Sequence, residues 1–557
     1  MRILSASRWL PIPLLWMLIV LPPVHGRAAG DSALVSAARA NDPQTVQALI
    51  ADRVDVNEPA ADGSTALLWA VYHSNAEMAQ ALVASGAAAD TPNGFGVTPL
   101  LQASRVGDAQ LVDLLLSAGA DAARAYADSE TPLMAAARSG RLDAVRLLLE
   151  AGADPNLTDR FQQQTPLMWA AAEGHADAVA ALLEFGAEPN AQARQTTLEE
   201  RKHADHPTGG LTALMFAVRN GHEPAARALL AGGADPNLTN GDGLTAMAVA
   251  IVNDRFDLAS ALLDLGADAN DGPSLYFAVD MHDATTDMRA HDGSRLRVDH
   301  PNRLGALDLV RRLLEAGADP NKPFIGQIHN TTLCCAPEVN SSPIFRAAQA
   351  ADVEALKLLI AHGARVDWTP AEVSKPEDED GGGGAGRGMN ANVGKTPVML
   401  AMVGGRGAPF AAGPGFVRLG PPPFREEANR EPADAVRVLL DAGADPNVVA
   451  PDGSTPLHQA VKARRVPVIR ALVGAGARLD AVDRENLTPL LLAEKPEPPP
   501  PEGNNNDERV YQPEVDTRED VISALRELMG LGPDEPAPVP PPLPEGDATA
   551  AEADEPA

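Results

Sequence analysis

The sequence predicts an all-α fold, a solenoid of about twelve helix–turn–helix units with projecting hairpin loops. Three observations lead to this prediction. Two short motifs recur along the 557 residues at a step near 33. The segments between them have apolar residues at helical spacing. Aromatic residues make up only 4% of the chain, which suits small, closely stacked helices better than a large enzyme core.

Two motifs carry the repeat. The first, Gly-Ala-Asp-Pro-Asn, begins at Gly152, Gly233, Gly317 and Gly443, with near copies at Gly186 and Gly266. The second is Thr-Pro-Leu or a close variant, which begins at Thr65, Thr98, Thr131, Thr165, Thr212, Thr245, Ser342, Thr396, Thr455 and Thr488. The first five steps of this motif are 33, 33, 34, 47 and 33 residues. The chain is therefore periodic, with insertions that interrupt the period.

The unit that begins at Thr131 shows how each element arises. Thr131 is placed to cap a short helix, and Pro132 occupies its first position, where the missing N–H is not needed. Gly140 ends this helix in the left-handed conformation. A second helix follows, and its apolar face comprises Leu142, Val145, Leu148 and Leu149. The Asp-Pro-Asn after Gly152 favours a turn that directs the chain outward as a loop. Because no helix pair can bury its apolar face alone, the pairs must stack.

These residues resemble the ankyrin repeat family. The Thr-Pro-Leu start, the glycine between the helices, the Leu-Leu-Leu-Glu-Ala-Gly-Ala-Asp-Pro-Asn end and the 33-residue step all match, over residues 31 to about 530. The resemblance implies antiparallel helix pairs in a curved stack, with hairpin fingers and inner helices that form a concave binding face. The family's histidine after Thr-Pro-Leu is present only as His458, so the usual hydrogen bonds at the other helix starts are in question.

The two ends of the chain differ from the repeats. Residues 1–30 have Arg2 and Arg8 before an apolar stretch of about a dozen residues, which predicts a secretory signal peptide rather than a membrane-spanning helix. We therefore expect an exported protein, periplasmic or extracellular, without stable membrane insertion after cleavage. Residues 531–557 are acidic and proline-rich, and we expect them to be disordered.

Six insertions interrupt the solenoid of residues 31–530. They lie at about 191–210, 281–304, 322–341, 369–393, 404–427 and 496–513. None exceeds about 30 residues, which is short of the roughly 50 that an independent domain needs. A catalytic domain therefore has no place in the chain, and we expect no enzyme activity and no cofactor.

The Gly-Lys-Thr at residues 394–396 resembles the end of a phosphate-binding loop. Such a loop needs a second glycine five residues before Gly394, where the chain has Met389. No apolar strand precedes the segment. Lys395 is therefore expected to precede a repeat that opens at Thr396.

Histidines gather in the first three insertions. These are His203, His206, His282, His291, His300 and His329. With nearby aspartates they allow a metal-dependent activity as an alternative function. Their spacing matches no known ligand pattern, so solvated polar loops are the favoured interpretation and we expect no metal. Cys334 and Cys335 are adjacent and enclose no chain loop, which favours incidental thiols over a redox role.

The net charge of −31, from 76 acidic and 45 basic residues, disfavours nucleic acid and permits a basic protein partner. Trp69 and Trp169 are expected to pack against the inner helices. Because the resemblance places partner contacts in the fingers, Phe95, Tyr126 and Phe161 are the predicted contact residues. The predicted function is a protein–protein interaction scaffold outside the cytoplasm, and a secreted effector or immunity-type binder is an alternative.

Overall fold

The computed structural model describes residues 32–123, 130–195, 209–282, 302–327, 338–370, 394–402, 431–496 and 516–541. These residues belong to two compact units, which divide between Asp268 and Ala269. The predicted signal peptide, Tyr126, the vicinal cysteines and tail residues 542–557 lie outside the described residues.

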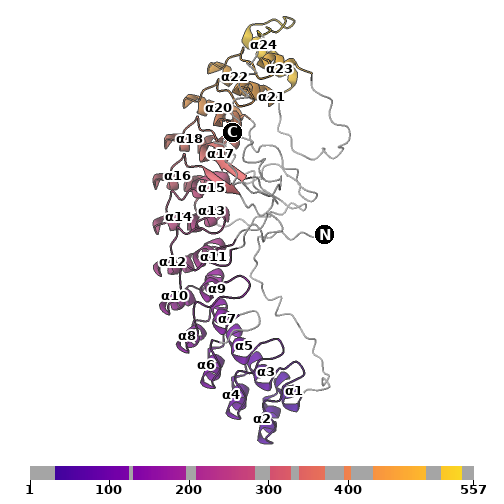
Figure 1. Ribbon diagram of the computed structural model, residues 1–557, viewed down its shortest axis with the longest axis vertical. Helices are drawn as coiled ribbons and strands as arrows, with labels where there is room; N and C mark the ends of the chain where they lie inside the picture. Colours follow the sequence, from indigo (N-terminus) through magenta and orange to yellow (C-terminus); the bar gives the residue numbers. More distant parts are fainter. Residues whose placement is uncertain are drawn as a thin grey trace, which may run out of the picture. The chain divides into compact units, whose positions relative to one another are not determined.

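Each unit is a stack of helix pairs, in which we call the first helix of a pair inner and the second outer (Figure 1). The inner helices of unit 1 are α1 (Ala33–Arg39), α3 (Ala66–Tyr72), α5 (Pro99–Val106), α7 (Pro132–Ser139), α9 (Pro166–Glu173), α11 (Ala213–Asn220) and α13 (Ala246–Val252). Its outer helices are α2 (Pro43–Ala51), α4 (Ala76–Ala84), α6 (Ala109–Ser117), α8 (Leu142–Glu150), α10 (Ala176–Glu184), α12 (Glu223–Ala231) and α14 (Phe256–Asp264).

Unit 2 repeats the same plan. Its inner helices are α15 (Pro273–His282), α17 (Pro343–Gln349), α19 (Pro397–Ala401), α21 (Pro456–Lys462) and α23 (Pro489–Glu494). Its outer helices are α16 (Ala306–Glu315), α18 (Val353–Ala361), α20 (Pro432–Asp441), α22 (Val466–Gly474) and α24 (Arg518–Met529). The 24 helices of the described residues make twelve pairs, which confirms the predicted all-α solenoid of about twelve units.

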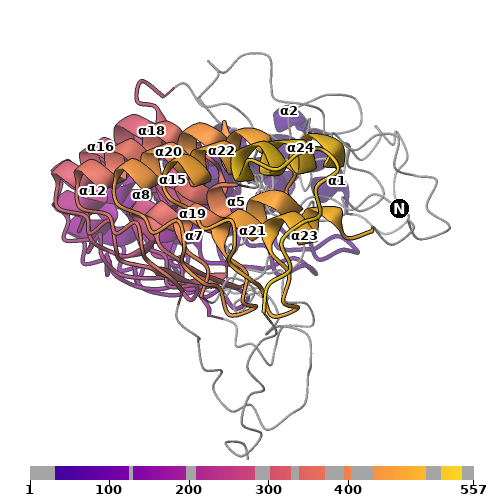
Figure 2. The same ribbon diagram turned by 90° about the horizontal axis from the view of Figure 1, so that it is seen from above.

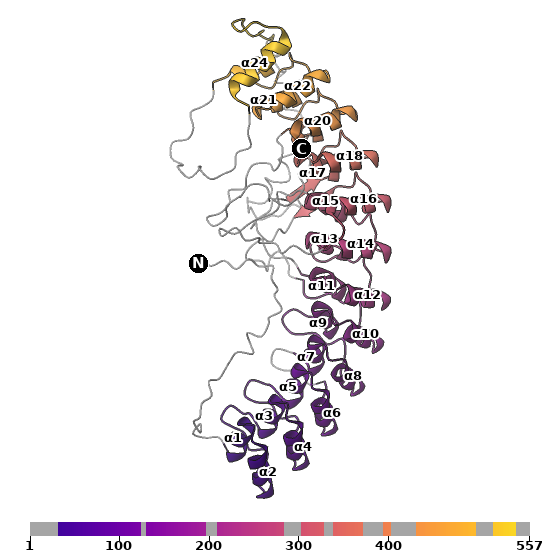
Figure 3. The same ribbon diagram turned by 180° about the vertical axis from the view of Figure 1, so that it is seen from behind.

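Within each unit, each inner helix packs on the next inner helix and the outer helices form a second row. Figures 2 and 3 show the two rows from above and from behind, with loops beyond the inner row. The apolar faces meet between the rows, where Val145 and Leu148 of α8 are completely buried. None of the described helices is long and apolar enough to cross a membrane.

At seven of the Thr-Pro-Leu motifs and their variants, the threonine side chain caps an inner helix, as predicted for Thr131. The hydroxyl of Thr131 accepts a hydrogen bond from the backbone N–H of Met134 at 3.2 Å. The same bond, at 3.2–3.3 Å, forms at Thr65, Thr98, Thr165, Thr212, Thr245 and Thr488. These units lack the family's histidine, so the threonine caps the helix without it.

His458, where the histidine is present, adds a link between repeats. Its ring is completely buried, and Nδ1 accepts a hydrogen bond from the backbone N–H of Thr455 at 3.2 Å. Nε2 lies 2.9 Å from the carbonyl oxygen of Leu487, to which it donates. His458 therefore joins the start of α21 to the loop before α23.

The asparagine of Gly-Ala-Asp-Pro-Asn connects one repeat to the next. Nδ2 of Asn156 donates to the carbonyl oxygen of Gly186 at 3.0 Å, and Oδ1 accepts from the backbone N–H of Glu188 at 2.8 Å. The same pair of bonds forms at Asn57, Asn190, Asn321 and Asn447. The motif thus combines a turn with an inter-repeat bridge, which we call the asparagine bridge.

One pair of strands adds to the all-α plan in unit 2. Strands β1 (Phe324–Gln327) and β2 (Glu338–Ser341) are antiparallel, with Phe324 opposite Ser341. The ring of Phe324 packs 5.3 Å from that of Tyr276 and 4.9 Å from that of Phe277, both on α15. This aromatic contact fixes the base of the third insertion on the helical stack.

The other insertions fall at two kinds of place. Those near 191–210 and 369–393 lie between one helix pair and the next, whereas those near 281–304, 404–427 and 496–513 lie between the two helices of a pair. Most of their residues lie outside the described ranges. Past α24, Arg526 donates hydrogen bonds to the carbonyl oxygens of Gly532 and Glu535, which holds the start of the segment predicted as tail.

Candidate interaction surface

The fingers, as we call the loops between an outer helix and the next inner helix, have a common turn at the tip. In the finger before α5, Oδ1 of Asn93 accepts hydrogen bonds from the backbone N–H groups of Phe95 and Val97, each at 3.0 Å. Gly96 supplies a φ of 80°, a conformation that strains other residues. Similar side-chain acceptors occur at Asp62, Asp159, Asn240, Asp452 and Asp483. Because the turn fixes its own backbone, the tip has a defined shape.

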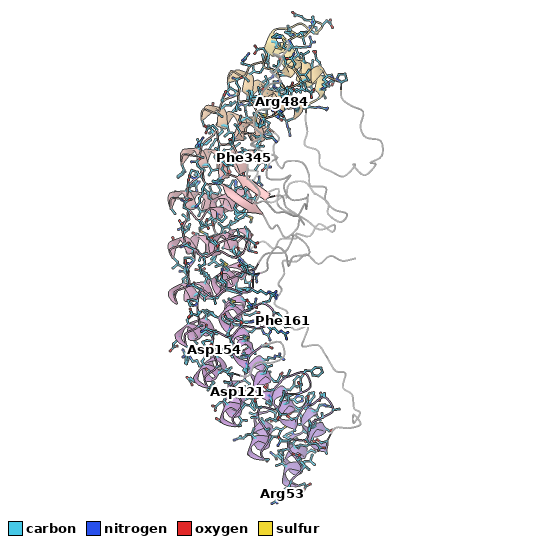
Figure 4. All side chains as sticks on the ribbon, in the orientation of Figure 1. Arg53, Asp121, Asp154, Phe161, Phe345 and Arg484 are labelled. Atoms are coloured by element: carbon cyan, nitrogen blue, oxygen red, sulfur yellow. The ribbon has the colours of Figure 1, made fainter. Side chains whose placement is uncertain are left out.

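Two of the predicted contact residues lie at these tips. The side chain of Phe95 is 77% exposed and that of Phe161 is 62% exposed. Asp159 holds the second tip by accepting the backbone N–H of Phe161 at 2.9 Å. Figure 4 labels Phe161 on the finger side of unit 1. The third, Tyr126, lies outside the described residues.

Neighbouring fingers of unit 1 are linked by backbone hydrogen bonds. The N–H of Gly94 donates to the carbonyl oxygen of Asp62 at 2.7 Å, and the N–H of Arg194 donates to that of Gln162 at 2.6 Å. A third link joins Gly241 to Gly209 at 3.0 Å. These bonds hold the tips in register with one another, so the surface they present is formed before any partner arrives.

Aromatic and arginine side chains alternate on the inner helices behind the fingers. The guanidinium of Arg39 lies 4.9 Å from the centre of the Trp69 ring, and that of Arg138 lies 5.3 Å from the centre of Trp169. Both tryptophans are half-buried, as expected for rings packed on the inner helices. Tyr72 meets Trp69 edge-on and is 55% exposed.

A three-residue ion cluster lies between α5 and α7. The carboxylate of Glu130, which is 15% exposed, binds Nη2 of Arg105 and lies 3.3 Å from Nη2 of Arg138. The side chains of Arg105 and Arg138 are 32% and 40% exposed. Two half-exposed guanidiniums therefore share one carboxylate on the inner-helix surface.

Histidines of unit 1 have structural positions at the turns between inner and outer helices. The ring of His175 covers Gly140, and Nε2 lies 3.0 Å from the carbonyl oxygen of Arg138. His222 covers Gly174 in the same way, and burial lowers its pKa. Each ring packs on a glycine and has its Nε2 bonded to a backbone carbonyl oxygen, so both histidines contribute to the packing of neighbouring repeats.

The histidine-rich insertions give little support to a metal site in the part that the structure describes. Of their six histidines only His282 lies in the described ranges, and its Nδ1 contacts Oδ2 of buried Asp352 at 2.5 Å. Within those ranges no group of three or more His, Cys, Asp or Glu side chains could hold a metal ion. Thr396, after the Gly-Lys, is the N-cap of α19, as the repeat pattern predicts.

The arginines of the inner helices were missed by the sequence reasoning, although a signal for them exists. Arg39, Arg105, Arg138 and Arg219 each lie seven residues after the N-cap residue of their helix. Equal register in stacked helices places side chains on the same face. The caps and glycines reveal the repeat without the polar positions, and the column becomes visible only when the polar positions of successive repeats are aligned as well.

A comparison with protein families agrees with this architecture. A family model that describes three successive ankyrin repeats matches the chain over five ranges, residues 14–93, 34–126, 100–193, 195–272 and 427–496. Together these ranges cover more than half of the chain. Among solved structures, the human ASB11 ankyrin repeat domain is 26% identical with a TM-score of 0.33, and the match covers 39% of this chain and 90% of that one. No curated protein matches the sequence. The chain belongs to the ankyrin repeat family, whose repeats are generally protein–protein interaction modules.

Proposed function

We propose that the protein is an exported scaffold that binds another protein through the fingers and inner helices of its repeats. The observation that carries the proposal is the exposure of Phe95 and Phe161 on tips whose backbones are fixed by hydrogen bonds. Large aromatic side chains are enriched at the energetic centres of protein interfaces. A preformed surface binds without the cost of ordering its loops.

Export is the second part of the proposal, and the pattern of residues 1–30 supports it. Cell fractionation of the full chain and of a variant without these residues tests it directly. The full chain is expected in the periplasmic or extracellular fraction and the truncated chain in the cytoplasm. Equal distribution of the two would refute export.

The binding proposal is tested by affinity capture from native envelope and secreted extracts. The purified protein is compared with the double variant Phe95→Ala/Phe161→Ala and with Phe185→Ala. Phe185 is a matched control because it is 36% exposed and caps the end of outer helix α10, away from the fingers. We expect one stoichiometric protein that the double variant loses and the control retains. Equal retention by all three proteins would contradict a role for the fingers.

The net charge supports a basic partner, which stays a prediction from the sequence. If it is correct, the association rate measured by stopped flow falls as salt concentration rises. An effector or immunity-type binder is the same class of function with a different partner. A metal-dependent activity of the insertions remains the alternative of another class, and metal analysis of the purified protein tests it.

A further inference from the structure

The four arginines Arg39, Arg105, Arg138 and Arg219 form what we call the arginine column of unit 1. Each lies seven residues after a helix N-cap, at Ser32, Thr98, Thr131 and Thr212. The inner helices of the unit pack in succession, so this common register places the four guanidiniums along one side of the inner row.

The charge of the column is opposite to that of the rest of the unit. Every outer helix of unit 1, taken with its following turn, contains two or three acidic residues, and the basic residues in these segments are Arg53, Arg146 and Arg227. In the inner helices of the unit, by contrast, the acidic residue is Glu173. A chain with a net charge of −31 thus has a locally basic surface on its inner helices.

Two acidic residues at the described finger tips of unit 1, Asp62 and Asp159, accept hydrogen bonds from the backbone. Oδ1 of Asp62 accepts the N–H of Ser64 at 2.9 Å. Asp159 is 8% exposed, and its two oxygens accept the backbone N–H groups of Phe161, Gln162 and Gln164. Carboxylates whose lone pairs are engaged by local N–H groups compete weakly for a guanidinium.

Aromatic rings support three of the four arginines. Arg39 lies over Trp69, Arg138 over Trp169, and Arg219 lies 5.0 Å from the centre of the Phe216 ring. Stacking uses the face of a guanidinium, whereas carboxylates bind its in-plane N–H donors. Stacking by itself therefore leaves the in-plane donors of a guanidinium able to bind a carboxylate, as Arg138 does with Glu130.

Glu130 shows that a carboxylate fits this surface. It enters from the finger segment before α7 and contacts both Arg105 and Arg138. Two guanidiniums on one carboxylate leave positive charge at that point of the column. An intramolecular acidic residue thus already occupies the position that we assign to a carboxylate of a partner.

We propose that the arginine column of unit 1 binds the carboxylates of an acidic, extended segment of the partner protein, laid across the inner helices. The inference rests on the proposed function, because it names the chemistry of one segment of the partner. The basic character predicted from the net charge then belongs to the rest of the partner's surface. The exposed ring of Tyr72, which occupies the column position on α3, offers an apolar contact between the charged ones. The acidic outer row opposes a long polyanion such as nucleic acid, which favours a short acidic segment.

The test selects peptides against the purified protein from a displayed library of random twelve-residue sequences. The most enriched peptide is then synthesised with a fluorescent label, and its affinity is measured by anisotropy. We expect enriched sequences with an excess of Asp and Glu, and a dissociation constant that rises with salt concentration. Enrichment of sequences without that excess would overturn the inference while leaving protein binding intact. No enrichment at all would count against the proposed function as well.

Three variants locate the binding. Arg138→Gln should weaken the peptide about threefold to fivefold, the effect of one half-exposed ion pair. The matched control Arg146→Gln, which removes the same charge from outer helix α8, should leave the affinity unchanged. Glu130→Gln should strengthen binding by a similar factor, because it removes the carboxylate that competes for two guanidiniums.

Two results would overturn the assignment to the arginine column. One is an equal loss of affinity in Arg138→Gln and Arg146→Gln, which indicates a general effect of charge. The other is binding of a single-stranded DNA of equal charge as tightly as the peptide, with the same dependence on Arg138, which indicates a polyanion site. Urea midpoints of the three variants, compared with the parent, exclude unfolding as the cause of a loss.

Discussion

Replacing Asn156 by alanine removes the asparagine bridge between the fourth and fifth helix pairs of unit 1. The side chain donates to the carbonyl oxygen of Gly186 at 3.0 Å and accepts from the N–H of Glu188 at 2.8 Å. A hydrogen bond contributes about 0.5–1.5 kcal/mol net. Because the bridge is exposed, water can replace Asn156 at both backbone groups, so the lower part of that range applies to each bond. The expected loss is about 1–2 kcal/mol at this interface.

Hydrogen exchange, resolved by mass spectrometry to α8 and α10, is the appropriate assay. In a repeat array an interface can open locally, so a single global unfolding free energy is not well defined. Asn156→Ala should lower the opening free energy of these helices by the stated amount and leave α1 to α4 unchanged. The measured urea midpoint should fall in the same direction.

The preceding repeat allows a matched substitution that should stabilise the stack. Ala123 occupies the bridge position there, and its N–H makes the same turn bond, to Oδ1 of Asp121 at 2.9 Å. Ala123→Asn should therefore install a bridge to Gly152 and Asp154 and raise the opening free energy of α6 and α8 by about 1 kcal/mol. Two results together would refute the bridge as a stabilising element. Asn156→Ala would leave the opening free energy of α8 and α10 unchanged within about 0.3 kcal/mol, and Ala123→Asn would not raise that of α6 and α8.

The remaining predictions concern pH, a glycine and a finger. Burial lowers the pKa of His458 from its usual value near 6.5, so at lower pH the unfolded chain binds more protons than the folded one. The stability of unit 2 should be full above about pH 6.5 and fall as the pH drops below it. His458→Leu should flatten this dependence in urea titrations across pH, and an unchanged slope would contradict the assignment. Gly140→Ala should cost clearly more than Gly152→Ala, because both have positive φ but only at Gly140 would a Cβ meet the ring of His175, at 2.3 Å. Equal thermal midpoints of the two variants would contradict the contact. Phe161→Ala should change the stability of unit 1, taken from urea titrations, by no more than about 0.5 kcal/mol, as expected of an exposed side chain. A large loss of stability would show that the ring packs within the fold.

Most of the fold was predictable because its signals are local in sequence. A threonine caps the helix that directly follows it, and a glycine with positive φ ends the helix before it, so Thr131 and Gly140 define α7 without reference to the rest of the chain. Repetition of these signals at a step near 33 residues then implies the stack. The fingers were predictable for the same reason, and with them the exposed positions of Phe95 and Phe161.

The surface between repeats was decided by the tertiary structure. Glu130 meets Arg105 and Arg138, and Asn156 meets Gly186, only because stacking brings successive repeats side by side. Phe324 of β1 likewise meets the rings of Tyr276 and Phe277 only because the third insertion packs on α15. Sequence period determines that repeats stack, since caps and glycines act within one repeat. Which side chains pair across the interface depends on rotamers and on the displacement of each helix against its neighbour, and these are properties of the packed stack alone.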